Sequence, residues 1–124
     1  MASPNPVSDT QVGLLRDTVV SLVRRSSADL SARQLAVFLT CYLNEDGHTV
    51  RGLAAELDVS KPAITRALDR LGKLDLARHK RHRADGHSVL VQRTPKGSAF
   101  LRELRTIMTD ASGDGKKASK KSAA

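Results

Sequence analysis

The sequence predicts a mainly α-helical domain with a small β-hairpin, and three observations support this. Apolar residues recur at three- and four-residue steps along several segments, which is the period of an amphipathic helix. A short helical pattern at residues 51–57 is followed by a turn and by a second helical pattern that begins at Ser60. Beyond it, the pair Asp85-Gly86 separates two short basic segments, as in a hairpin. This order is that of a winged helix-turn-helix.

The first helix is predicted over residues 9–25. It follows residues 1–8, which hold two prolines and little apolar content and are expected to form a flexible arm. Ser26 and Ser27 mark the end of the helix. One amphipathic stripe runs along it, formed by Val12, Leu15, Val19 and Leu22.

A second helix is predicted to follow Ser31 and to run to about Leu43. Ser31 and Gln34 have the spacing of a capping box, in which each side chain satisfies an exposed backbone N–H of the other residue. The turn cluster at residues 44–47 ends the helix. Apolar residues occupy most of its sides, so it is expected to be the central, most buried helix: Leu35, Ala36, Val37, Phe38, Leu39, Cys41, Tyr42 and Leu43.

The helix-turn-helix is predicted between residues 51 and 71, after a very short strand at residues 48–50. Asp58-Val59 makes the turn between its two helices. Ser60 is a good N-cap, and Pro62 lies in the first turn, where a missing N–H costs nothing. The inward residues are Leu53, Ala54 and Leu57 in the first helix, and Ile64, Ala67, Leu68 and Leu71 in the second.

The hairpin is predicted from strands at residues 77–81 and 88–93, after a chain reversal at Gly72. Thr94-Pro95 then begins a last helix. The domain is expected to span residues 9–109, and residues 110–124, rich in Gly, Ser, Ala and Lys, to form a disordered basic tail. The apolar stripe of the last helix includes Phe100, Leu101, Leu104, Ile107 and Met108.

Charge is distributed unevenly along the chain. The total is 21 Lys and Arg against 13 Asp and Glu, a net charge of +8, and residues 51–124 hold 17 of the basic and eight of the acidic side chains. This predicts a polyanionic partner, either nucleic acid or a membrane surface. No apolar run approaches the ~20 residues that span a bilayer, and the N-terminus lacks a signal-peptide pattern. A cytoplasmic, nucleoid-associated protein is therefore expected, with no membrane partner.

Double-stranded DNA is the nucleic acid that the sequence favours. Only Phe38, Tyr42 and Phe100 are aromatic, and all three lie at apolar helix positions. Proteins that bind single strands usually stack bases on exposed aromatic rings. Duplex binding instead needs a helix in the major groove and basic side chains beside it.

Two groups of residues are the candidate DNA contacts. The N-terminal outer face of the second helix-turn-helix helix would enter the major groove, with Arg66 and Thr65 near base edges and Ser60 near a phosphate. The basic hairpin would lie along the minor groove. The alternatives are a solvated helix face and a hairpin that adds only non-specific attraction. The candidates are Ser60, Lys61, Pro62, Thr65, Arg66, Arg70, Lys80, Arg81, Arg83 and His87.

The sequence gives little support for a metal site, a redox sensor or an enzyme. A metal site from His79, His82, Asp85 and His87 matches no common zinc spacing. Cys41 lies among apolar residues with no adjacent cation, which favours a buried structural thiol over a redox sensor. No phosphate-binding glycine motif or paired carboxylates are present, so neither enzymatic activity nor a cofactor is expected.

The stretch from Thr49 to Arg81, followed by SVLVQRTPKGSAFL, resembles the MarR family of bacterial winged-helix regulators. The resemblance rests on Leu53-Ala54, on Val59-Ser60 leading into PAITR at residues 62–66, and on Thr94-Pro95-Lys96-Gly97. It implies a homodimer that represses a pseudo-palindromic operator, with base or phosphate contacts from Ser60, Lys61, Thr65, Arg66 and Arg70. Gly86 and His87 stand where the family's wing usually has arginines. The Gly/Lys tail stands where a further helix is usual, which argues against a small-molecule effector.

A homodimer is also expected from the two apolar stripes that lie outside the helix-turn-helix. A domain this small cannot easily bury both within one chain. The expected dimer residues are Val12, Leu15, Val19, Leu22, Phe100, Leu101, Leu104 and Met108. The alternatives to a dimeric transcriptional regulator are a sequence-tolerant architectural DNA-binding protein and a winged-helix module that binds protein.

Overall fold

The structure is a computed structural model that describes residues 6–25, 29–44, 46–81 and 89–113. It divides into two compact units. The central unit spans residues 28–101, and the terminal unit combines residues 1–27 with residues 102–124. The cluster of buried hydrophobic side chains lies in the central unit.

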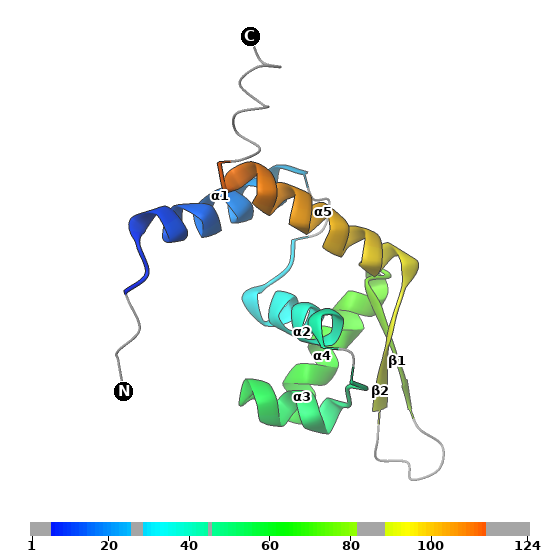
Figure 1. The fold of residues 1–124 in the computed structure, drawn as a ribbon. Coiled ribbons are helices and arrows are strands. Elements are labelled where there is room, and N and C mark those ends of the chain that lie inside the picture. Colours follow the sequence, from blue (N-terminus) through cyan, green and yellow to red (C-terminus); the bar gives the residue numbers. More distant parts are fainter. Residues whose placement is uncertain (1–5, 26–28, 45, 82–88, 114–124) are drawn as a thin grey trace. The chain divides into compact units, whose positions relative to one another are not determined.

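The central unit contains three complete helices and the start of a fourth; the complete ones are α2 (Ala32–Leu43), α3 (Val50–Leu57) and α4 (Lys61–Lys73). The predicted capping box of α2 is present, since the Gln34 N–H donates to Ser31 Oγ over 3.1 Å and the Ser31 N–H donates to Gln34 Oε1 over 2.9 Å. Helix α4 packs against α2, α3 and the hairpin (Figure 1). Each of the three helices lies within about a residue or two of its predicted range.

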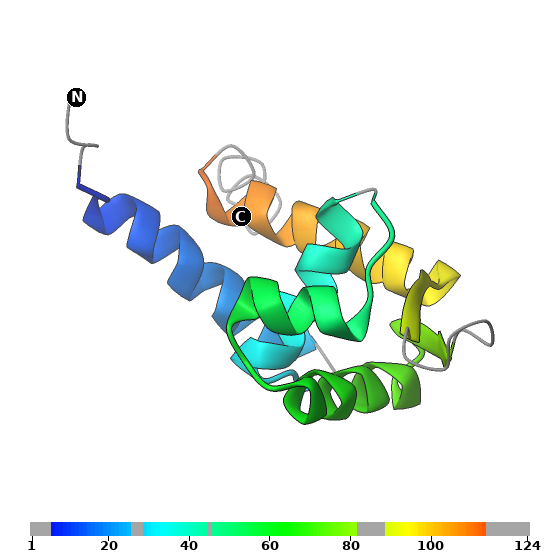
Figure 2. The same cartoon turned by 90° about the horizontal axis from the view of Figure 1, so that it is seen from below.

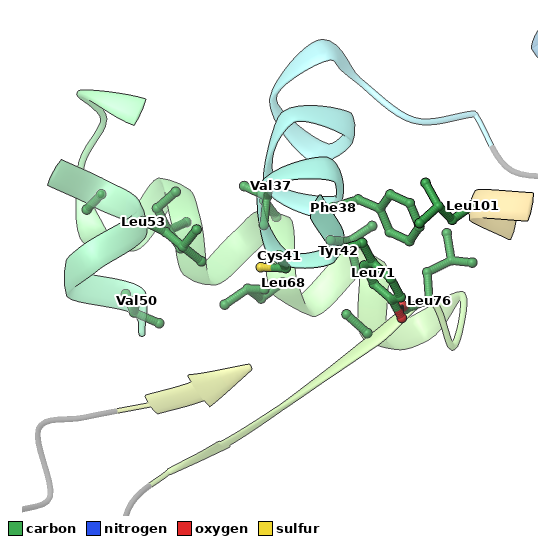
Figure 3. Close-up of a cluster of buried hydrophobic side chains, with 14 residues drawn as sticks. Val37, Phe38, Cys41, Tyr42, Val50, Leu53, Leu68, Leu71, Leu76 and Leu101 are labelled. Carbon is green, nitrogen blue, oxygen red and sulfur yellow. Dashed lines mark hydrogen bonds between the residues drawn. The ribbon is translucent and has the colours of Figure 1, made fainter. Parts of the chain in front are cut away.

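The core of the central unit forms where α2 meets α4. Phe38 lies at its centre and is fully buried. Its ring stacks on Tyr42 at a centroid distance of 4.3 Å and meets the edge of Phe100 at 5.1 Å. Figure 3 shows this cluster, with Leu71 and Leu101 beside the aromatic rings. The prediction that α2 is the central helix is confirmed for Val37, Phe38, Cys41 and Tyr42, but it is wrong for Leu43, which is 62% exposed.

The hairpin consists of β1 (Ala77–Arg81) and β2 (Val89–Arg93), paired antiparallel with His79 opposite Val91. The predicted strand at residues 48–50 is reduced to a bridge between Thr49 and Leu90, because Thr49 already serves as the N-cap of α3. The Asp85-Gly86 turn and Ser88 lie outside the described residues.

The chain reverses after α4 at Asp75, and the prediction that it does so at Gly72 is wrong. Gly72 lies inside α4, whereas Asp75 has a φ of 58°. Asp tolerates this left-handed region better than most residues, so the turn needs no glycine. The Asp75 carbonyl then accepts a hydrogen bond of 2.6 Å from Thr94 Oγ1.

Buried hydrogen bonds connect α2 and the residue before β1 to the start of α5 (Pro95–Ala111). Tyr42 Oη donates to the Leu76 carbonyl over 2.6 Å and accepts from the Thr94 N–H over 2.9 Å. Thr94 Oγ1 in turn accepts from the Gly97 N–H over 2.9 Å, which caps α5. The structure thereby confirms the predicted helix start at Thr94-Pro95.

The terminal unit contains α1 (Asp9–Arg25), whose range is as predicted. A capping box that the sequence analysis overlooked precedes it, because the Ser8 N–H donates to Gln11 Oε1 and the Gln11 N–H donates to Ser8 Oγ. Helix α5 continues in this unit to Ala111, two residues past the predicted end of the domain.

The apolar stripe of α5 is largely buried, which corrects the expectation that it lies outside the core. Leu101 belongs to the core of the central unit and Phe100 packs on Phe38. Leu104 is 6% exposed, whereas Met108 remains 42% exposed. In α1 the open stripe is Val12, Leu15, Val19 and Val23, because Leu22 is half-buried and Val23 takes its place on the surface.

Candidate nucleic-acid interface

Local geometry at the α3–α4 turn fixes the start of α4. Asp58 ends α3 in the left-handed region, with a φ of 54°, and the Val59 N–H donates to the Ala54 carbonyl over 3.1 Å. Ser60 then caps α4, since its Oγ accepts from the Ala63 N–H over 3.2 Å. Pro62 lies in the first turn, where it sets a helical φ and lacks only an N–H that would have no partner. The turn and the cap are as predicted.

The outer face of α4 is exposed and basic. Its inner side chains are buried: Ala63, Ile64, Ala67, Leu68 and Leu71. On the opposite side Lys61, Pro62, Arg66 and Arg70 are exposed and Thr65 is half-buried. In Figure 2, α4 runs along one edge of the central unit. The structure thus brings together the six sequence-predicted residues between Ser60 and Arg70 on one helix and at its cap.

None of the predicted contact residues in the hairpin has a side chain that the structure describes. Lys80 and Arg81 lie in β1, but only their backbone is described, and Arg83 and His87 lie outside the described residues. Arg78 is 66% exposed and pairs with Asp75 over 3.3 Å. An exposed pair of this kind contributes little to stability.

A side-chain contact that the sequence analysis did not find links α4 to β1. His79 Nε2 lies 2.9 Å from Asp69 Oδ1, and the two side chains are 27% and 55% exposed. The sequence analysis places His79 in the basic hairpin and weighs it as a metal ligand with three residues that lie outside the described part of the chain. The spacing of ten residues between a helix and a strand gives no local signal for this contact.

Cys41 has the surroundings of a structural thiol, as predicted, although one part of the prediction is wrong. A cation is near: the Arg93 guanidinium donates to the Cys41 carbonyl over 3.1 Å and to the Asn44 carbonyl over 2.8 Å. Burial nevertheless raises the pKa of the Cys41 thiol to about 11, against the smaller lowering effect of Arg93. The reactive thiolate is therefore scarce at neutral pH.

Comparison with known families shows which family this part of the sequence resembles. A sequence model of the MarR family matches residues 28–87, from the loop before α2 into the hairpin. Over these residues the sequence is similar to the MarR family. The predicted resemblance and the predicted winged helix-turn-helix fold are both confirmed.

Solved structures of MarR-family proteins share the fold at low sequence identity. The disulfide form of AbfR superposes with a TM-score of 0.69 at 17% identity, over 90% of this chain and 74% of that one. A mutant of Escherichia coli MarR in complex with operator DNA gives 0.61 at 22% identity, over 84% and 69%. The Staphylococcus aureus MepR–DNA complex gives 0.67 at 15% identity, over 88% and 87%.

The chain thus has the fold of the MarR transcriptional regulators. No curated protein sequence matches it significantly. Among the described helices, none combines the length and the apolar character that crossing a membrane requires.

Proposed function

We propose that this chain is a sequence-specific regulator of transcription that binds double-stranded DNA as a homodimer and represses a pseudo-palindromic operator. The observation that carries the proposal is the capped, exposed and basic outer face of α4 beside a basic hairpin. A helix cap that points its free N–H groups outward suits a phosphate, and an exposed helix of this size suits a major groove.

Within this interface the residues are proposed to have different tasks. Arg66 lies in the second turn of α4 and can donate two hydrogen bonds to guanine O6 and N7. Thr65 beside it can reach a base edge or a thymine methyl group. Ser60, Lys61 and Arg70 are proposed to hold the backbone, which fixes the register of the helix but carries no sequence information. Lys80, Arg81, Arg83 and His87 are proposed to extend the contact to the minor groove.

A homodimer is supported by the surface of α1. Its open stripe consists of apolar side chains that are 45–69% exposed: Val12, Leu15, Val19 and Val23. A contiguous apolar stripe left in water usually marks an interface. A twofold pairing through α1 would repeat the recognition helix, and two copies about 34 Å apart would meet successive turns of the DNA.

The first test is the salt dependence of binding to duplex DNA. Eight basic residues lie between Lys61 and Arg83, against Asp69 and Asp75. If about six of them neutralise phosphates, log K should fall with log salt with a slope near −5, because each contact releases counterions. Fluorescence anisotropy between 50 and 300 mM salt measures the slope. A slope near zero would contradict DNA binding and would favour a module that binds protein.

A second test separates base readout from backbone contact. We expect Arg66→Ala to lose about 1–3 kcal/mol on the selected operator and much less on random DNA, because only the operator offers the bases that Arg66 reads. Arg70→Ala is the matched control, since it removes the same exposed side chain one turn later and should weaken both targets alike. Equal losses on both targets with Arg66→Ala would assign Arg66 to the backbone. If the wild type also failed to discriminate operator from random DNA, the protein would be architectural.

A further inference from the structure

The outer face of α4 carries one acidic residue among its cations. Asp69 follows Thr65 by four residues and Arg66 by three, so it lies on the same side of the helix. Its side chain is 55% exposed. One carboxylate oxygen, Oδ1, is held by His79, and the other has no hydrogen-bond partner in the described part of the chain. A carboxylate in this position repels the phosphates of any duplex that approaches the face.

His79 is positioned by the hairpin and not by α4. It follows the buried Ala77 by two residues in β1, so its side chain points to the same side of the strand. Its cross-strand partner is Val91, which is apolar and half-buried. The imidazole is half-buried, and its Nε2 lies 2.9 Å from Asp69 Oδ1.

We propose that the Asp69–His79 contact positions the wing against the recognition helix, and that DNA binding takes up a proton on His79. This inference rests on the proposed DNA-binding function. A neutral imidazole donates from Nε2 in only one of its two tautomers, whereas an imidazolium donates from both nitrogens. The protonated ring makes a charge-assisted bond to Asp69 and cancels its charge, so the face no longer presents a free carboxylate to the phosphates.

The coupling between proton binding and DNA binding determines whether DNA affinity rises or falls with pH. The bound state is proposed to hold more protons than the free state, because the DNA phosphates favour the imidazolium only in the complex, whereas Asp69 lies beside His79 in both states. Affinity therefore rises as the pH falls through the range in which an imidazole changes charge. On the two elements that carry this contact, the charged groups near it in the sequence are Arg66, Arg70 and Lys73 on α4, and Asp75 and Arg78 at the start of the hairpin.

The test is operator affinity at pH 6 and pH 8 at constant ionic strength. The wild type should bind about three- to tenfold more tightly at pH 6, because uptake of one proton gives at most tenfold per pH unit. His79→Gln keeps a hydrogen-bond donor but cannot become charged, so its pH ratio should be flatter. His79→Arg carries a permanent charge and should bind at pH 8 as tightly as the wild type does at pH 6.

Two further variants separate positioning from simple charge. With Asp69→Asn, the advantage of His79→Arg over His79→Gln should shrink at least threefold, because the arginine loses its partner. Arg78→Gln is the matched control: it removes a cation from the neighbouring position of β1 and should leave the pH ratio unchanged. A melting curve at each pH confirms that every variant is folded.

The outcomes distinguish this inference from the proposed function. A wild type that shows no salt-dependent binding at either pH would overturn the proposed function. A wild type that binds with the expected salt slope, but whose pH ratio equals that of His79→Gln, would overturn the inference alone. An advantage of His79→Arg that is unchanged by Asp69→Asn would show that the histidine acts only as a surface charge and would overturn the positioning role.

Discussion

Gly97→Ala is expected to destabilise the protein by about 3 kcal/mol or more, which reverses the usual effect of this substitution in a helix. Alanine normally stabilises a helix relative to glycine by about 0.5–1 kcal/mol. A Cβ at Gly97, however, would overlap Tyr42 Oη and the carbonyl oxygen of Leu76. One of these two is backbone, so a rotation of one side chain cannot relieve the overlap.

The loss of stability would be large because the groups that surround Gly97 are held in place by hydrogen bonds. Tyr42 Oη both donates to the Leu76 carbonyl and accepts from the Thr94 N–H. To make room for a methyl group, either α5 or the Tyr42 side chain must move. Either movement breaks hydrogen bonds of Tyr42 Oη and leaves buried polar groups without partners. Each stranded group costs about 1–3 kcal/mol in addition to the overpacking.

Thermal unfolding of Gly97→Ala beside Gly13→Ala measures the effect. Gly13 lies in α1 with nothing within 4 Å of a Cβ, so the same substitution there should raise the melting temperature slightly. Gly97→Ala combined with Tyr42→Phe should cost less than the sum of the two single substitutions, because Tyr42 Oη is both an overlapping atom and a partner in the buried hydrogen bonds. A Gly97→Ala variant as stable as Gly13→Ala would contradict the packing described here.

Much of the fold could be predicted because its signals are local. Ser31 with Gln34, Ser60 with Pro62, and Thr94 with Pro95 each define a helix start within four residues, and all three are present. The reversal after α4 is predicted at Gly72, because glycine is the favoured turn residue, but the chain instead uses Asp75 with a positive φ. The sequence pattern alone does not distinguish the two.

The candidate site was predicted less completely, because its contacts join distant residues. The outer face of α4 follows from helical periodicity, but the pairing of Asp69 with His79 depends on how β1 crosses the helix. The contact of Arg93 with the Cys41 carbonyl spans 52 residues. Likewise, Phe100 and Leu101 fit an amphipathic stripe in the sequence, but the position of Phe38 determines that they belong to the core.

Leu15→Asp is expected to convert the proposed homodimer into a monomer. Leu15 is 62% exposed at the middle of the open α1 stripe, between Val12 and Val19. In a twofold interface every substitution occurs twice, and burying one leucine contributes about 1.5–3 kcal/mol. The loss of two such contributions, together with the burial of two carboxylates, should raise the dimer dissociation constant by at least about 10²–10⁴-fold.

The matched control is Leu43→Asp, because Leu43 is also 62% exposed but lies at the end of α2 and not on α1. Sedimentation velocity at micromolar concentration should show a dimer for the wild type and for Leu43→Asp, and a monomer for Leu15→Asp. The monomer should remain folded, since the α1 stripe is not part of the buried core of either unit, and it should bind a full operator no better than a half-site. A wild type that is already monomeric and binds both sites equally would contradict the dimer. So would a Leu15→Asp variant that still dimerises, since α1 would then not form the interface.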